Sequence, residues 1–136
     1  MQTVTADVPR DPEICWRAFV DPTKLTRWVP GLRRAEIIAG SRGLPSEIHF
    51  EFAGELAYTL VYTYDKPAHE VRWQPKLGKQ AGVTGFVRFE PAGQDTRVTY
   101  GLQHGDARST ADRELGDLRR LVDAFAAWVV NQYPAT

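Results

Sequence analysis

The sequence contains one set of side chains whose spacing suits proton transfer or metal binding. Glu47, His49 and Glu51 stand at positions i, i+2 and i+4, so in a β-strand they project from the same face. Two carboxylates beside an imidazole can exchange protons or bind a divalent metal. The residues that alternate with them are apolar and suit the core side of the strand: Ile48, Phe50 and Phe52. We therefore favour the alternative, in which this set is the solvent face of an amphipathic strand.

No other motif predicts a catalytic centre. The sequence has no G-x-S-x-G, H-E-x-x-H, C-x-x-C or G-x-G-x-x-G pattern. Cys15 is the only cysteine and has apolar neighbours on a predicted helix, so we interpret it as a small buried hydrophobe. His69 follows a turn and is expected to be exposed. We assign no catalytic residue, expect neither a metal nor another cofactor, and leave open whether the protein is an enzyme.

Tyrosines on one strand provide a different kind of signal. Tyr58, Tyr62 and Tyr64 are separated by even numbers of residues and so share one strand face. Buried hydroxyl groups need hydrogen-bond partners, which a pocket holding water or a polar ligand would supply. The alternative is a filled core in which the outer tyrosines reach water at the strand ends. We favour the pocket.

Composition narrows the classes of protein. The chain has 136 residues, a common size for one domain, so we expect residues 1–136 to form a single domain. Lys+Arg and Asp+Glu both number 17, and this balance gives no field that would attract nucleic acid. No apolar run approaches the ~18 residues that cross a membrane, and the N-terminus does not resemble a signal peptide. We expect a cytoplasmic protein.

The strongest periodic pattern lies at the C-terminal end, between Thr110 and Tyr133. Placed 100° apart, its apolar side chains fall within one broad arc, and charged residues occupy the opposite arc. This is the pattern of a long amphipathic helix. The residues of the apolar arc are Leu115, Leu118, Leu121, Val122, Phe125, Trp128, Val129 and Gln132.

The rest of the chain predicts two short helices and a sheet. Gln2 to Val8 alternates as a strand, and Asp11-Pro12 and Asp21-Pro22 are each typical of a helix start. Strand patterns then follow at 34–39, 47–53, 56–64, 69–74, 83–90 and 96–103. This order is that of an α+β fold with a curved antiparallel sheet of six to seven strands, because one helix cannot cover a flat sheet of that width.

Several segments resemble a known superfamily. They are the helix start Asp11-Pro-Glu13, the segment Ala18-Phe-Val-Asp-Pro-Thr-Lys-Leu-Thr-Arg-Trp28-Val-Pro-Gly31, the hairpin ends Phe89-Glu-Pro91 and Asp95-Thr-Arg-Val-Thr-Tyr100, and the terminal helix. Together they resemble the START / Bet v 1-like (SRPBCC) superfamily, and most of all its bacterial polyketide cyclase/dehydrase-like members. The resemblance covers essentially the whole chain. It implies a helix-grip fold, in which a curved sheet wraps the C-terminal helix around a hydrophobic cavity.

The resemblance and the aromatic side chains together predict a binding function. We expect a small hydrophobic ligand, such as a lipid, a polyketide-like molecule or an aromatic metabolite, between the sheet and the C-terminal helix. Cyclase/dehydrase-type activity without a cofactor is the enzymatic form of this hypothesis. The predicted ligand-binding residues are Trp28, Phe50, Tyr62, Trp73, Tyr100, Leu121, Phe125 and Trp128.

Two alternatives remain open at this point. The segment 18–28 resembles the Hsp90-ATPase-activator-like branch almost as well, which predicts a protein-interaction module with a protein partner; a toxin-like or ubiquinone-binding relative is a third hypothesis. A pocket of several hundred Å3 would favour ligand binding, and a filled interior with an exposed apolar patch would favour a protein partner. We expect a monomer or a weak homodimer.

Overall fold

The computed structural model of the chain describes residues 2–41, 43–53, 57–76, 83–104 and 118–134. In these residues seven strands form one antiparallel sheet, in the order β1-β7-β6-β5-β4-β3-β2. All the predicted strands are present, some with ends shifted by one to three residues. The strands are β1 (Gln2–Val8), β2 (Leu32–Ser41), β3 (Leu44–Phe52), β4 (Ala57–Asp65), β5 (Glu70–Pro75), β6 (Val83–Ala92) and β7 (Asp95–His104).

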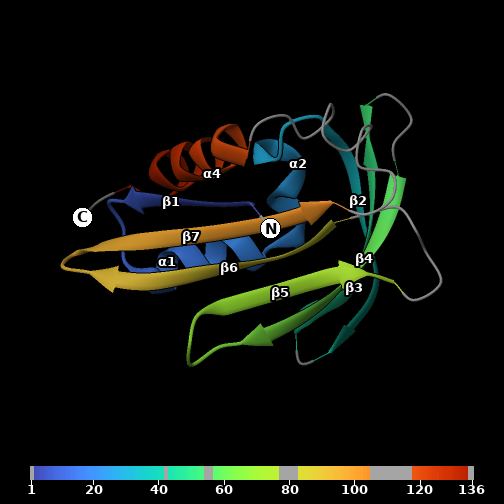
Figure 1. Ribbon diagram of the computed structural model, residues 1–136, viewed down its shortest axis with the longest axis horizontal. Coiled ribbons are helices and arrows are strands. Elements are labelled where there is room, and N and C mark those ends of the chain that lie inside the picture. Colours follow the sequence, from blue (N-terminus) through green and yellow to red (C-terminus); the bar gives the residue numbers. More distant parts are fainter. Residues whose placement is uncertain (1, 42, 54–56, 77–82, 105–117, 135–136) are drawn as a thin grey trace.

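The sheet is strongly curved, as predicted. Figure 1 shows β2 and β4 standing at a steep angle to β1 and β7, so that one face of the sheet is concave. Register shifts interrupt the pairing of β2 with β3 between Leu32 and Arg34 and around Ala39, and such bulges bend and twist a strand locally. The concave face is therefore deep enough to enclose side chains from several helices.

Two Asp-Pro pairs start the short helical segments after β1. Asp11 caps α1 (Pro12–Val20) by accepting a hydrogen bond from the backbone N–H of Ile14 at 2.9 Å, and Asp21 caps the 3-10 turn η1 (Pro22–Lys24) in the same way. The second short helix predicted from the sequence is divided into η1 and a single helical turn, α2 (Leu25–Trp28). These segments bring Phe19, Leu25 and Trp28 into the buried core.

The terminal helix α4 (Leu118–Gln132) packs on the concave side, near β1, α1 and α2 (Figure 1). Its predicted first turns, from Thr110, lie outside the described residues. Two positions of the predicted apolar arc differ from expectation: Gln132 is exposed and Trp128 is only half-buried. The buried residues of the helix are Leu118, Leu121, Val122, Phe125 and Val129.

A polar contact ties the end of α4 to the connection between β1 and α1. The guanidinium of Arg10 donates to the backbone carbonyls of Tyr133 and, at 3.1 Å, Val130. The Thr96 hydroxyl donates to the Arg10 carbonyl at 2.7 Å. A cation at a helix C-terminus also interacts favourably with the helix dipole. These contacts hold the C-terminal end of α4 to the connection between β1 and α1 and to β7.

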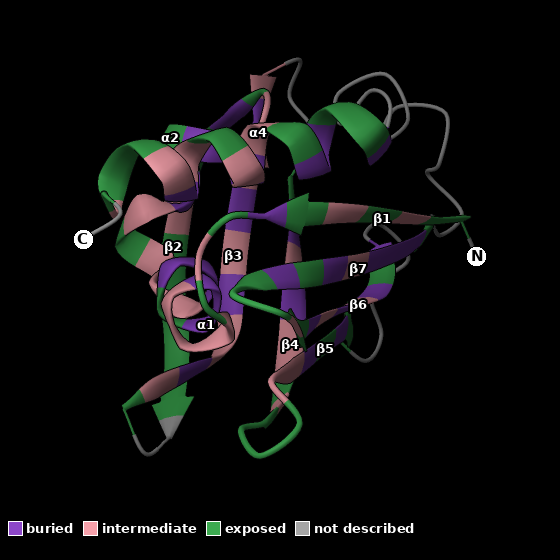
Figure 2. Cartoon of the chain, turned by 90° about the vertical axis from the view of Figure 1, so that its left-hand side faces the viewer, coloured by how far each residue is buried: buried purple, intermediate pink, exposed green. Residues whose placement is uncertain are grey.

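The buried side chains lie between the curved sheet and the helices that pack against it. Figure 2 shows buried positions alternating with exposed ones along the strands that flank the helices. The largest fully buried side chains include Phe89, Phe125 and Ile48, which come from β6, α4 and β3. The core is therefore formed by the sheet and the helices together. This is the helix-grip fold that the sequence resemblance implied.

Candidate ligand-binding cavity

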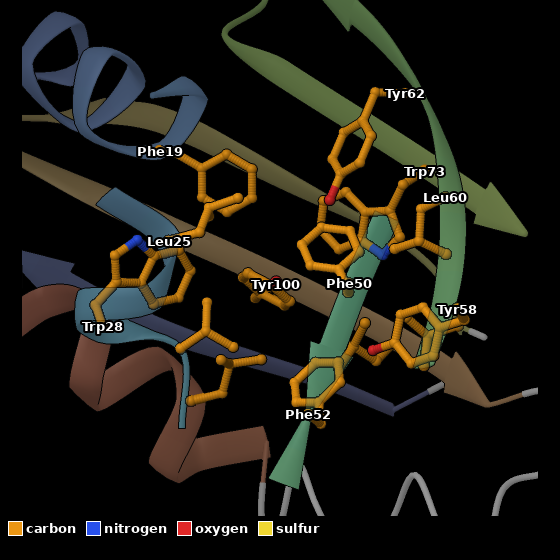
Figure 3. A pocket seen from close by; sticks show the side chains of 14 residues that line it. Phe19, Leu25, Trp28, Phe50, Phe52, Tyr58, Leu60, Tyr62, Trp73 and Tyr100 are labelled. Atoms are coloured by element: carbon orange, nitrogen blue, oxygen red, sulfur yellow. The ribbon is translucent and has the colours of Figure 1, made fainter. Parts of the chain in front are cut away.

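A cavity lies between the concave face of the sheet, α2 and the start of α4. Phe19 from the end of α1 and the α2 residues Leu25 and Trp28 form one wall, and alternating residues of five strands form the other (Figure 3). Its walls are made entirely of uncharged side chains. The lining residues are Phe19, Leu25, Trp28, Val29, Phe50, Phe52, Tyr58, Leu60, Tyr62, Trp73, Val83, Tyr100, Leu102 and Leu121.

The cavity is small. Its volume is about 50 Å3, which is enough for a few water molecules at roughly 10–15 Å3 each. Pockets that enclose drug-sized ligands measure about 300–1,000 Å3. The volume is thus below the several hundred Å3 that would by itself favour ligand binding. A ligand must either be very small or move the surrounding side chains apart.

Three tyrosine hydroxyls supply polar atoms to this otherwise apolar cavity. Tyr58 and Tyr62 reach it from β4, and Tyr100 reaches it from β7. Figure 3 shows the hydroxyls of Tyr58 and Tyr62 directed among the surrounding rings. None of the three hydroxyls makes a hydrogen bond to the described part of the chain. Unpaired polar groups are costly to bury. Water or a ligand that forms hydrogen bonds with these hydroxyls would remove that cost.

The surrounding protein strengthens the preference of these tyrosines for the neutral form. Desolvation by the protein raises the pKa of Tyr58 and of Tyr100 far above the ordinary value, and it does the same for Tyr62. The neighbouring tyrosines add to the increase at Tyr62 and Tyr100. All three therefore stay neutral at physiological pH, and each can donate a hydrogen bond to an acceptor oxygen.

Aromatic contacts hold the walls together. Phe19 lies within 5.8–6.1 Å, centroid to centroid, of five other rings: Trp28, Trp73, Phe89, Tyr100 and Phe125. Trp73 also lies 5.3 Å from Tyr100 and 5.9 Å from Tyr62. Aromatic pairs at such distances contribute about 0.5–1.5 kcal/mol beyond their buried area. Phe19 is the centre of this cluster, and the sequence-based site did not include it.

Trp28 forms part of the cavity wall and carries an unsatisfied polar atom. Only 5% of the residue surface is exposed, and its indole N–H is buried without a hydrogen-bond partner. The ring packs 5.0 Å from Phe125 and 5.8 Å from Phe19. Trp28 thus packs α2 against the core and also lines the cavity.

The structure gathers most of the residues predicted to bind a ligand. Phe125 is instead buried behind the wall against Phe19, Trp28 and Phe89. Trp128 packs against the core elsewhere, with its own indole N–H unpaired. Neither of these two lines the cavity. The six that do are Trp28, Phe50, Tyr62, Trp73, Tyr100 and Leu121.

Some wall residues could have been found from the sequence and others could not. Tyr58 and Leu60 share the strand face of Tyr62, and Phe52 shares that of Phe50, so period-2 alternation predicts them. Val83 and Leu102 lie near the ends of β6 and β7, and no local pattern separates them from ordinary core positions. Their role depends on where the strands end in the sheet.

A second, smaller cavity adjoins the first. Its volume is about 10 Å3, close to that of a single water site. It lies between α1 and η1 on one side and β3 and β4 on the other. The two cavities share Phe19, Leu25 and Tyr62. The other residues lining the second cavity are Val20, Pro22, Pro45, Ile48 and Tyr64.

The carboxylate–imidazole–carboxylate set does not form a joint site. The His49 Nδ1 lies 3.0 Å from the Thr59 hydroxyl, whereas Glu47 pairs with Lys76 and Glu51 pairs with Arg34. These residues project from the sheet face opposite the buried Ile48, Phe50 and Phe52, as the favoured interpretation predicted. Within the described residues, no group of three His, Cys, Asp or Glu side chains is arranged to hold a metal ion.

His69 and Cys15 have different surroundings. His69 was expected to be exposed, but its side chain is only 26% exposed and its Nε2 lies 3.2 Å from a carboxylate oxygen of Glu13. The expectation was wrong because α1 packs beside the β4–β5 turn, which sequence patterns do not reveal.

Cys15 is fully buried, as expected. Burial raises the pKa of its thiol to about 11, so it is not a nucleophile at neutral pH.

The family described as "Polyketide cyclase / dehydrase and lipid transport" matches residues 1–133. No curated protein matches the sequence. No helix in the described part of the chain has the length and apolar character needed to cross a membrane.

Several solved structures share the fold. A protein from Thermus thermophilus aligns with a TM-score of 0.77 at 17% identity, over 96% of this chain and 97% of the other. A START superfamily protein from Mycobacterium smegmatis gives 0.76 at 17%, over 96% and 97%. The Zhui aromatase/cyclase from a Streptomyces species gives 0.75 at 14%, over 98% and 95%. At such low identities these structures establish the fold.

Proposed function

Because this chain belongs to the polyketide cyclase/dehydrase and lipid transport family, within the START / Bet v 1-like superfamily, we propose that it binds a small, uncharged aromatic molecule between the sheet and α4. One observation carries the proposal. Three neutral tyrosine hydroxyls, those of Tyr58, Tyr62 and Tyr100, face a cavity of otherwise apolar walls and have no hydrogen-bond partner in the described part of the chain.

The lining residues support an uncharged ligand. None of them carries a charge, and a carboxylate placed among them would lose its hydration without gaining a counter-ion. Carbonyl, ether and phenol oxygens could instead accept hydrogen bonds from the tyrosines. Among the ligand classes expected from the sequence, an aromatic or polyketide-like molecule therefore fits better than a fatty acid. Burying its apolar surface would contribute about 25 cal/mol per Å2.

The small volume of the cavity sets a condition on this proposal. The wall of the cavity consists largely of aromatic rings in contact with one another, and a flat ligand could replace some of these ring–ring contacts with its own. Opening the cavity would cost the contacts that are lost. We therefore expect modest affinities for single-ring and two-ring compounds.

Cyclase/dehydrase-type activity is the second candidate function. Its support is the family match and the likeness of the fold to aromatase/cyclase structures. One of these is the di-domain StfQ of steffimycin biosynthesis, which is 18% identical to this chain; the alignment covers 45% of StfQ. The cavity would then serve to fold a reactive chain and exclude water. The tyrosines are the only ionisable groups among the lining residues. Their raised pKa values keep the phenols protonated near pH 7, so they could donate hydrogen bonds but would not serve as general bases.

The protein-interaction alternative has weaker support. Among the described residues, Ile37 and Ile38 are the exposed large hydrophobic side chains, each 50% exposed. They are adjacent on the edge strand β2. A docking surface for a folded partner normally buries about 800 Å2 on each protein, far more than two side chains supply. The cytoplasmic location and the monomeric or weakly dimeric state stay predictions.

A thermal-shift experiment tests the proposed function. The full chain is heated with acetophenone, 2-acetylnaphthalene or dodecanoate across a concentration series. A ligand at 100 times its dissociation constant adds about 2.7 kcal/mol to the free energy of unfolding, which is several degrees in a domain of this size. We expect the two uncharged aromatic ketones to raise the melting temperature and dodecanoate to leave it unchanged. An unchanged melting temperature with both ketones would contradict the proposal.

A further inference from the structure

The two cavities on the concave side of the sheet are separated by very few side chains. Both are lined by Phe19, Leu25 and Tyr62. Figure 3 shows Tyr62 at one side of the main cavity, with its hydroxyl directed inward among the rings. Removing one of these side chains would therefore join two spaces that are now distinct.

The row of side chains along β4 shows how Tyr62 divides the space. Tyr58 and Leu60 line the main cavity, Tyr62 lines both, and Tyr64 lines the second cavity. Alternate residues of a strand lie on one face and are spaced by about 6.6 Å. The four residues thus follow one another from the main cavity into the second, and the Tyr62 ring stands at the boundary.

Tyr62 makes fewer specific contacts than Phe19 and Tyr64 at this boundary. Tyr64 is fixed by a hydrogen bond from its hydroxyl to the Pro45 carbonyl, at 2.6 Å, and Phe19 is enclosed by five rings. The Tyr62 hydroxyl has no hydrogen-bond partner in the described residues. Its ring is held by contacts with Tyr64 at 6.2 Å, Trp73 at 5.9 Å and Phe50 at 6.4 Å.

We propose that Tyr62 determines the length of ligand that this protein accepts. The ring ends the main cavity, and the hydroxyl binds the acceptor oxygen of an uncharged aryl ketone that stops at this point. A longer molecule would have to displace the ring in order to reach the second cavity beside Pro45 and Tyr64. This inference rests on the proposed ligand-binding function and adds the residue that sets its specificity.

A series of n-alkyl phenyl ketones measures this limit. The compounds run from acetophenone to decanophenone, remain uncharged and keep one carbonyl acceptor. Affinity for the wild-type protein, measured by thermal shift, should increase by up to about fourfold for each buried methylene and stop increasing at a short chain. In Tyr62→Ala the increase should continue for about three more methylenes, because the two cavities become continuous.

Tyr62→Phe is the matched control, because it keeps the ring and loses the hydroxyl. It should keep the wild-type length limit and bind every ketone of the series about 2–10-fold more weakly. Tyr62→Leu, which also removes the ring but retains more packing volume, replaces Tyr62→Ala if the alanine variant fails to fold.

The outcomes separate this inference from the proposed function. If the wild-type protein binds short ketones and the ring-deleted variant has the same length limit, the role of Tyr62 is wrong and ligand binding stands. If Tyr62→Phe extends the limit as far as the ring deletion does, the ring is not the boundary. If the wild-type protein binds no ketone of any length, the proposed function itself fails.

Discussion

Tyr58, Tyr62 and Tyr64 lie on the same strand, β4, but their hydroxyls do not have the same hydrogen-bond partners. Those of Tyr58 and Tyr62 resemble that of Tyr100 on β7. Tyr64 donates to the Pro45 carbonyl and so satisfies its own hydroxyl within the fold. The other three have no such partner in the described residues and face the cavity. A hydroxyl that stabilises the fold is thus distinguished from one available to a ligand by the position of a single backbone carbonyl.

The double variant Tyr62→Phe/Tyr100→Phe tests these hydroxyls as ligand anchors. Each lost hydrogen bond costs about 0.5–1.5 kcal/mol of binding free energy, so the loss of two should make 2-acetylnaphthalene bind about 5- to 160-fold more weakly. Folding stability should change little, because neither hydroxyl has a protein partner in the described residues. Titration calorimetry measures the affinity. Tyr133→Phe, which removes a hydroxyl away from the cavity, is the control; equal affinity in the double variant and the control would show that these groups are not the anchors.

At the scale of elements, the cavity depends on how closely β6 approaches its two neighbours, β5 and β7. Gly85 of β6 pairs with Trp73 of β5. A Cβ atom on Gly85 would lie 2.9 Å from two carbons of the Trp73 indole ring and closer still to the Gly101 carbonyl oxygen. Only a glycine leaves room for the Trp73 indole at this position, where it forms a cavity wall and contacts Tyr62 and Tyr100.

Gly85→Ala should therefore destabilise the fold and displace Trp73. Overpacking of this kind costs about 1–3 kcal/mol, and Trp73 must shift to make room for the methyl group. We expect a lower urea midpoint for unfolding and altered tryptophan fluorescence in the folded state. Thr84→Ala, at the adjacent exposed position of the same strand, should change neither by much. A Gly85→Ala variant with wild-type stability and fluorescence would show that the sheet can move to accommodate the methyl group.

Across the whole molecule, an ion cluster joins α1 to the turn between β4 and β5. Lys66 Nζ lies 2.7 Å from both carboxylate oxygens of Glu13, and His69 Nε2 lies 3.2 Å from one of them. Lys66 also lies 5.2 Å from the centre of the Trp16 ring. This cluster connects helix and sheet at a distance from the cavity, so its loss should affect stability without directly affecting the ligand.

The cluster predicts a pH dependence of stability. The hydrogen bonds from Lys66 and then His69 lower the pKa of Glu13 below its ordinary value of 4.5. Its contribution to stability is therefore complete above that value and is lost as the pH falls through the lowered pKa. Glu13→Gln should reduce the free energy of unfolding at pH 7 by less than about 1 kcal/mol, because the pair is partly exposed.

The difference between wild type and Glu13→Gln should shrink as the pH is lowered below 4.5. Urea unfolding between pH 3 and pH 7 measures it. Glu90→Gln is the matched control, because Glu90 is also an exposed carboxylate but its ion pair is longer, with 3.9 Å between the carboxylate and an Arg88 nitrogen. A difference for Glu13→Gln that is constant over the whole pH range would exclude the proposed role of the Glu13 carboxylate.

Much of this fold could be predicted because its signals are local. Asp11-Pro12 and Asp21-Pro22 start helical segments through hydrogen bonds that span three residues or fewer, and the strands follow from period-2 alternation. The candidate site could be predicted only in part. Alternation places Tyr62 and Trp73 on the inner face, but it does not distinguish a residue that lines a cavity from one buried behind it. Phe125 was predicted to line the cavity, and it lies behind Trp28.

The sequence by itself determined the α+β class, the order of the elements, the inner faces of the strands and the absence of charge on them, because periodicity and composition are properties of neighbouring residues. Only the tertiary structure decided which inward side chains meet around empty space. That depends on strand register, on the close approach at Gly85 and on where α2 and α4 lie against the curved sheet, and all of these are set by contacts between residues far apart in the chain. The cavity and the role of Tyr62 within it follow from these long-range contacts.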